Sequence, residues 1–320
     1  MVPLLSAVLA TALLAVASLF VGVGDVSPAA LISAAPEDRA ALLLAASRVP
    51  RTLAILLAGS SLAIGGLVMQ MIVRNRFAEP STTGTTEAAT LGLLLATLLA
   101  PGWPPIAKMA VSALFALGGT ALFLRILRFV PLRDAMLVPL VGLMFGGVIG
   151  ALATFLALRF QLLPSLLAWT TGDFSAVLRG RYELLWLGLG ATLLAYWAAD
   201  RLTLAGMGRD VAVGLGLNHE AATALGLVLV SVIAAVSLAS VGAIPFLGLV
   251  VPNLVSLAVG DNMRATVPWV AIGGAALVLA CDILGRLLRY PYEIPIGVVM
   301  GVLGSALFLA LLLRTRRHGA

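Results

Sequence analysis

Residues 221–241 read AATALGLVLVSVIAAVSLASV, a stretch of 21 residues without a single charged side chain. A helix of roughly 20 apolar residues is long enough to cross the hydrocarbon layer of a membrane. Strands of a membrane barrel would alternate apolar and polar residues, and this stretch does not alternate. It therefore predicts a membrane-spanning helix.

Similar runs occupy most of the chain. Of the 320 residues, 61% are hydrophobic and only 11% are charged, whereas soluble domains carry about 25% charged residues. We therefore expect an all-α polytopic membrane protein, with spans at about 4–23, 52–73, 86–100, 106–127, 135–158, 182–200, 221–241, 244–258, 268–286 and 294–313.

Three of these spans have features of their own. The first has no basic residue before it and no clear cleavage site before Asp25, so we expect a retained helix rather than a signal peptide. Residues 86–100 and 244–258 are short for a full crossing, so we expect neighbouring helices to shield them. Paired glycines such as Gly65-Gly66 and Gly273-Gly274 predict close packing between helices.

Ten spans place both ends of the chain on one side of the membrane. The basic tail predicts that this side is the cytoplasm. Eleven of the 20 Lys and Arg residues then lie inside and nine outside. Because this bias is weak, either the topology is inverted or the outer face carries positive charge for a function. We favour an acidic partner or an anionic ligand that arrives from outside.

Composition excludes several kinds of site. One cysteine, Cys281, and two distant histidines, His219 and His318, cannot assemble a metal centre, so we expect no metal and no cofactor. The sequence lacks the Gly-x-x-x-x-Gly-Lys-Ser/Thr pattern of a P-loop, so we expect no nucleotide site of that kind and no ATPase activity in this chain. Arginines spread over the loops between spans indicate topology and docking, with lipid and not nucleic acid as a partner.

Polar residues at one rim of the predicted bundle form a first group of candidates. Arg48 and Arg51 flank Pro50 in the stretch SRVPRTL (47–53), at the start of the second span. Such arginines either reach to lipid headgroups or form a rigid basic platform for carboxylates. Asp282 and Arg286 are four residues apart, so they share a helix face and can pair.

Three further segments interrupt the apolar pattern. In MQMIVRNRFAEP (69–80), Gln70 lies within a span, where it lines a pathway or bonds to a neighbouring helix. The stretch GRDVAVGLGLNHE (208–220) is apolar for a cytoplasmic loop, which favours a short helix that docks into another protein, with Asn218 as the cap of the next helix. The stretch VGAIPFLGLVVPN (241–253) combines Gly and Pro with an apolar run.

Together with SRVPRTL (47–53) and the pair ACDILGR (280–286) and EIPIG (293–297), these three segments resemble the permease family of ATP-binding-cassette importers for ferric siderophores, haem and cobalamin. The resemblance implies a type II importer permease fold, with residues 1–320 as one transmembrane domain. It also implies a permease that moves a ferric siderophore from periplasm to cytoplasm, or haem or cobalamin as the alternative within the family.

The same resemblance implies partners and sites. A dimer of ATPase subunits would bind on the cytoplasmic side, a binding protein would dock from the periplasm, and a second permease would complete the path. The positions implied for docking of the binding protein are Arg48, Arg51 and Arg286. Those implied for ATPase coupling, in the segment at about 206–220, are Gly208, Arg209, Asp210, Val213, Gly214, Leu217 and Asn218. Those implied for the pathway or gate are Gln70, Arg133, Ala135, Met136 and Asn253.

Two departures from the commonest family pattern narrow the expectation. Asn253 stands where many members have histidine, and residues 76–85 replace the usual run containing Asn-Pro-Leu-Ala. Both variants are similar to the branch for catecholate-type siderophores, which often has two different permeases. We therefore expect a heterodimer, with a homodimer as the alternative.

The main rival function is that of an ion-coupled secondary transporter. Such proteins place coupling carboxylates near the middle of the membrane. The predicted spans offer Asp282 as the only clear candidate, and Arg286 lies beside it. An intramembrane enzyme would need a nucleophile with a base, which His219 and His318 cannot supply from their predicted cytoplasmic positions.

Overall fold

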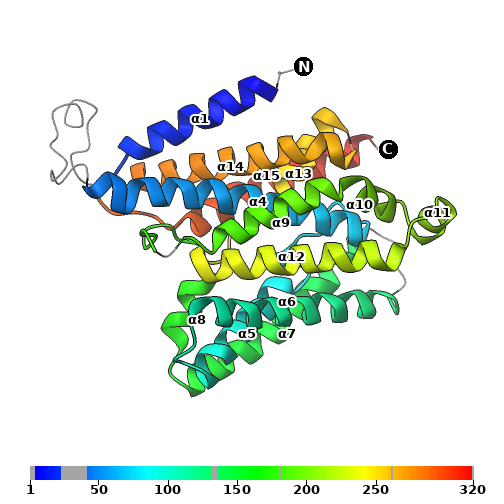
Figure 1. Ribbon diagram of the computed structural model, residues 1–320, viewed down its shortest axis with the longest axis horizontal. Helices are drawn as coiled ribbons and strands as arrows, with labels where there is room; N and C mark the ends of the chain where they lie inside the picture. Colours follow the sequence, from blue (N-terminus) through cyan, green and yellow to red (C-terminus); the bar gives the residue numbers. More distant parts are fainter. Residues whose placement is uncertain (1–3, 23–41, 131–135, 181, 261, 319–320) are drawn as a thin grey trace.

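The computed structural model describes residues 4–22, 42–130, 136–180, 182–260 and 262–318. These residues form helices joined by short turns, without a β-strand among them, and most of the helices run along one common direction (Figure 1). The α-helices are α1 (Leu4–Phe20), α4 (Val49–Val73), α5 (Thr85–Leu99), α6 (Pro105–Leu127), α7 (Leu137–Arg159), α8 (Leu163–Thr170), α9 (Leu185–Trp197), α10 (Ala199–Gly206), α11 (Arg209–Gly214), α12 (His219–Val241), α13 (Leu247–Val259), α14 (Met263–Leu287) and α15 (Ile296–His318).

Each of the ten predicted spans coincides with a helix, so the prediction of an all-α polytopic fold is confirmed. Five of these helices, α4, α6, α7, α12 and α14, are long and apolar enough to cross a membrane. The other five predicted spans correspond to the shorter apolar helices α1, α5, α9, α13 and α15.

The sixth predicted span, 182–200, was wrong in its extent. The structure has two helices here, because α9 ends at Trp197 and α10 begins at Ala199. The second helix packs against α14, where Asp200 forms an ion pair with Arg264 at 2.8 Å. The sequence also gave no sign of α8, which has only 8 residues.

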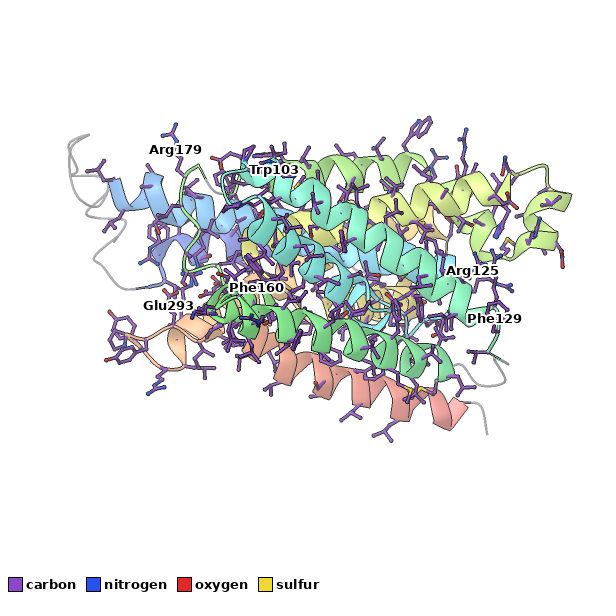
Figure 2. The ribbon with its side chains drawn as sticks, turned by 90° about the horizontal axis from the view of Figure 1, so that it is seen from below. Trp103, Arg125, Phe129, Phe160, Arg179 and Glu293 are labelled. Atoms are coloured by element: carbon purple, nitrogen blue, oxygen red, sulfur yellow. The ribbon has the colours of Figure 1, made fainter. Side chains whose placement is uncertain are left out.

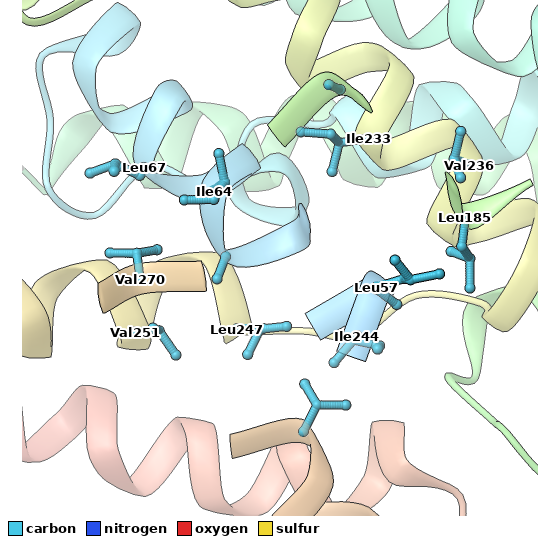
Figure 3. Packing of buried hydrophobic residues seen from close by; sticks show 14 of the residues in the cluster. Leu57, Ile64, Leu67, Leu185, Ile233, Val236, Ile244, Leu247, Val251 and Val270 are labelled. Carbon is cyan, nitrogen blue, oxygen red and sulfur yellow. The ribbon is translucent and has the colours of Figure 1, made fainter. Parts of the chain in front are cut away.

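Helix α4 lies at the centre of the bundle. In its most apolar window 78% of the residues are buried, against 22% in α7, so α7 is peripheral. Side chains from many of the helices meet in the hydrophobic core (Figure 3). They include Leu57, Ile64 and Leu67 of α4, Ile233 and Val236 of α12, Leu247 and Val251 of α13, and Val270 of α14.

Glycines let two helices approach the backbone of α4. A Cβ atom on Gly66 would overlap the backbone of Gly248 in α13, and one on Gly59 would clash with the carbonyl of Gly274 in α14. These contacts confirm the close packing predicted from the pairs Gly65-Gly66 and Gly273-Gly274.

The short helices α5 and α13 are shielded by neighbouring helices, as their lengths predicted, and both begin inside the bundle. Gly248, at the start of α13, touches Gly66, which lies about 10 Å along the axis from the end of α4 at Val73. Gly84, which precedes α5, lies against Phe145 and Gly146 near the middle of α7. Both helix N-termini therefore point into the interior of the bundle.

The two ends of the bundle carry different loops. Trp103, Arg179 and Glu293 lie at one end, which we term the Glu293 end, and Arg125 and Phe129 lie at the other (Figure 2). Helix α1 begins and α15 ends at this second end, where α11 also lies (Figure 1), so we term it the α11 end. This arrangement agrees with an even number of crossings.

Candidate functional site

A network of ion pairs joins α4, α14 and the segment before α15 at the Glu293 end. Arg51 Nη2 lies 2.7 Å from Asp282 Oδ1, and Arg51 Nη1 lies 2.7 Å from Glu293 Oε2. On the other side of the same carboxylate, Arg286 Nη2 lies 2.5 Å from Asp282 Oδ2. The predicted pairing of Asp282 with Arg286 is confirmed.

The last turn of α1 completes this arginine cluster. Arg286 donates to the carbonyl oxygens of Ser18 and Val21 at 2.9 and 2.7 Å, and Arg48 also donates to Val21. The three arginines therefore lie together, and their exposed fractions are low: 9% for Arg48, 9% for Arg51 and 2% for Arg286. Arg51 and Arg286 bind carboxylates of this chain, which leaves little of them to reach lipid headgroups.

The predicted coupling segment contains a short helix at the α11 end. Helix α11 spans Arg209–Gly214, and Gly208 precedes it with φ of 108°, a conformation that favours glycine. Val213 and Leu215 expose 56% and 62% of their surface there. Exposed apolar side chains in a loop at the end of the bundle are typical of a surface that another protein covers.

The remaining coupling candidates anchor this segment. The Asn218 side chain accepts from Ala221 N at 3.0 Å, so it caps α12 as predicted. Arg209 lies 3.4 Å from Glu220, and both side chains are exposed. Asp210 and Gly214 are exposed, and Leu217 lines a hollow together with Asn218.

Two of the predicted pathway residues line a cavity of about 380 Å³ toward the α11 end. Gln70 Nε2 donates to Gly248 O of α13 at 3.3 Å, so it both bonds to a neighbouring helix and lines this cavity. Asn253 donates to the carbonyls of Arg76 and Leu249, each at 2.7 Å. Met136 is exposed at the start of α7, whereas Arg133 and Ala135 lie outside the described residues.

Glu79 is a site residue that the sequence reasoning missed. It is only 2% exposed, and its Oε1 accepts from Phe246 N at 3.0 Å and from Ser81 Oγ at 2.5 Å. Phe246 is the residue before α13, so Glu79 caps the N-terminus of that helix from 167 residues away. A carboxylate is stabilised at this end of a helix dipole.

Glu87 is the second residue that was missed. It lies in the first turn of α5 and packs against Gly146 of α7. The expectation that Asp282 is the only clear carboxylate within the spans is therefore wrong. The signal was present, because Glu87 belongs to the predicted span 86–100. A Glu at the start of a span suggests the membrane surface, but α5 starts in the interior.

Comparisons with known proteins agree with this geometry. Residues 10–314 match the model of the FecCD transport family. The chain is 44% identical over 306 residues to the petrobactin import system permease protein YclN of Bacillus subtilis (strain 168), covering 96% of each chain. It is 44% identical over 278 residues to the ferric-anguibactin transport system permease protein FatD of Vibrio anguillarum, covering 87% of this chain and 88% of the relative.

A solved structure matches the fold over nearly its whole length. It is an inward-facing conformation assigned to the metal-chelate type of ABC transporter, with a TM-score of 0.80 and 27% sequence identity. The match covers 97% of this chain and 98% of that one. The family resemblance inferred from the five sequence motifs is thus confirmed.

Proposed function

Since this chain belongs to the FecCD transport family, we propose that it is the permease subunit of an ATP-driven importer for a ferric siderophore. The observation that carries this proposal is its likeness, over 96% and 87% of its length, to permeases named for petrobactin and anguibactin import. The helical bundle supplies a multi-pass membrane body for such a subunit. We place it in the bacterial inner membrane with both termini in the cytoplasm.

Energy would come from a separate ATPase dimer at the α11 end. The chain lacks a P-loop sequence, and Val213 of α11 and Leu215 directly after it are exposed. A short helix with exposed apolar side chains suits the groove of a partner protein. We propose that the segment from Gly208 to Asn218, which contains α11, transmits the movement of the ATPase to the bundle.

A binding protein would dock at the opposite, Glu293 end. The guanidinium groups of three arginines, Arg48, Arg51 and Arg286, gather at this end. Acidic side chains of a docked protein would be attracted to it. Because the guanidinium groups are largely buried, the docked carboxylates would have to compete with the internal ones.

The transport path requires a second permease subunit. Helices α7 and α15 both carry exposed apolar side chains, including Leu143, Val148, Phe155 and Val302. We propose that a second permease, encoded separately or identical to this one, covers part of this surface. Gln70, Met136 and Asn253 remain our candidates for the pathway or gate.

Uptake of radioactive iron tests the proposed function. We expect a strain that lacks its own siderophore permeases to accumulate ferric petrobactin or ferric anguibactin once it carries this chain with its ATPase, binding protein and partner permease. Radiolabelled cobalamin and haem serve as the alternative cargoes. Uptake of cobalamin without uptake of either ferric siderophore would overturn the siderophore assignment and keep the importer.

A further inference from the structure

A second cavity, of about 340 Å³, lies between α5, α7, α8 and α12. It is closed on one side by the segment that leads into α13 and by the turn around Glu79. Small-molecule sites have volumes of about 300–1,000 Å³, so this cavity holds a small group rather than a whole chelate. Residues of two segments noted in the sequence, 69–80 and 241–253, line this cavity, but none of the individual site candidates does.

Depth in the membrane makes the carboxylates of this cavity unusual. Glu87 lies against Gly146, close to the middle of α7 (Leu137–Arg159). The middle of a spanning helix corresponds to the centre of the hydrocarbon layer, where a charged group is costly and is retained for function. Two carboxylates, Glu79 and Glu87, share this cavity, and none of the described residues lining it is Lys, Arg or His.

Hydrogen bonds of the lining threonines add acceptors to the cavity. Thr90, Thr154 and Thr170 each donate their hydroxyl proton to a carbonyl of their own helix, at 2.8, 2.8 and 3.0 Å. A hydroxyl whose only proton is already in a hydrogen bond can act toward a ligand only as an acceptor. The cavity is therefore lined by oxygen acceptors and suits a ligand that donates.

Two polar atoms in this cavity have no partner of their own. Glu87 Oε2 is buried without a hydrogen bond among the described residues, and so is Ser237 Oγ. Ser237 is only 2% exposed and lines the same cavity. Glu79 differs, because it already caps α13. A buried acceptor without a donor is costly, which indicates that something absent from the free chain supplies the donor.

We propose that this cavity binds an organic ammonium group of the transported chelate, with Glu87 as the carboxylate that holds it. This inference rests on the proposed importer function, because the cargo supplies the ligand. An ammonium carries both the charge that compensates a carboxylate in the membrane and the N–H donors that Glu87 Oε2 lacks. A divalent metal fits less well, since no group of three or more His, Cys, Asp or Glu occurs among the described residues.

Protection of Glu87 from a hydrophobic carbodiimide tests this site on the full-length permease in nanodiscs. Dicyclohexylcarbodiimide modifies carboxyl groups in apolar surroundings, and mass spectrometry of peptides locates the adduct. The probe is butylammonium chloride, with butan-1-ol as the uncharged match and sodium chloride as the ionic-strength match. We expect saturating butylammonium to slow modification of Glu87 about tenfold, because the bound probe excludes the reagent.

Each outcome decides the matter. Equal slowing by butan-1-ol would show an apolar cavity, and no slowing by either would show that no ammonium binds; both overturn the proposal. If the reagent does not reach Glu87, the thermal unfolding midpoint of the permease is measured instead. Butylammonium should raise this midpoint for the wild type and leave it unchanged for Glu87→Gln. For Ser237→Ala the rise should be intermediate. An absent shift in the wild type also overturns it. If butylammonium protects Glu87 but cells show no iron uptake, the proposed importer function is rejected and the ammonium site stands.

Discussion

Arg51 and Asp282 are separated by 231 positions in the sequence, yet Arg51 Nη2 and Asp282 Oδ1 are 2.7 Å apart in the structure. The same aspartate also binds Arg286. One buried carboxylate therefore links α4 to α14 and compensates two buried guanidinium groups, and Arg286 continues the link to α1.

Loss of this carboxylate should destabilise the protein strongly. Asp282→Ala leaves two buried arginines with one carboxylate, and removal of one partner from a buried ion pair costs about 3–5 kcal/mol. The measurement is unfolding of the purified protein in mild detergent. Asp200→Ala is the matched control, because the Asp200–Arg264 pair is exposed and should cost at most about 1 kcal/mol. Equal losses for the two variants would contradict the structural role of the cluster.

Backbone contact between α4 and α13 leads to a second prediction. A methyl group on Gly66 overlaps the backbone of Gly248, so Gly66→Ala should separate the helices and cost about 3 kcal/mol. Gly147→Ala in α7 is the control, because nothing lies within 4 Å of its added Cβ. Alanine favours a helix over glycine, so that variant should be neutral or more stable by up to about 1 kcal/mol. Unfolding midpoints of the two variants measure the difference.

The sequence alone predicted features that depend on near neighbours. Hydropathy over a window of about 20 residues located a helix at each of the ten predicted spans, because the membrane selects for length and apolarity. The spacing of Asp282 and Arg286 predicted their pair, since residues four apart share a helix face. The cap at Asn218 is likewise a local effect.

Features set by distant parts of the chain could not be predicted in this way. Nothing within residues 75–90 reveals that α5 starts in the interior, because this depth depends on packing against α7. Glu79 and Glu87 were missed for that reason. Pairing of Arg51 with Asp282 and Glu293 joins residues more than 200 positions apart, which a single sequence does not encode in its spacing.

Docking of a binding protein should respond to the internal partner of Arg51. Glu293→Gln removes the carboxylate that holds Arg51 Nη1, and the Glu293 side chain is 28% exposed. If incoming carboxylates compete for this arginine, the variant should bind the binding protein about fivefold more tightly, which corresponds to about 1 kcal/mol. Surface plasmon resonance on nanodiscs measures this affinity.

A control separates competition from general charge. Glu183→Gln removes one exposed negative charge near the same end without freeing an arginine, because Glu183 binds only the Gly180 backbone among the described contacts. Equal tightening by both variants would point to net charge, and unchanged affinity in Glu293→Gln would remove Arg51 from the docking site. Raised salt should weaken the effect, since exposed charges are screened within about 8–10 Å.

The exposed face of α11 leads to the last prediction. Val213 is 56% exposed and contributes to no described ion pair or core cluster, so Val213→Glu should leave the unfolding midpoint unchanged. Against an apolar groove of an ATPase, the same change buries an unpaired charge and should weaken co-purification by more than about tenfold. Glu220→Ala is the control on the same segment, because its exposed pair with Arg209 contributes little. ATPase that stays bound to Val213→Glu while binding is lost in Glu220→Ala would move the contact from α11 to the start of α12. If Val213→Glu loses the ATPase as expected, cells with this variant should also lose iron uptake at normal membrane levels of the permease. The cause would be lost coupling, since the folded bundle is intact.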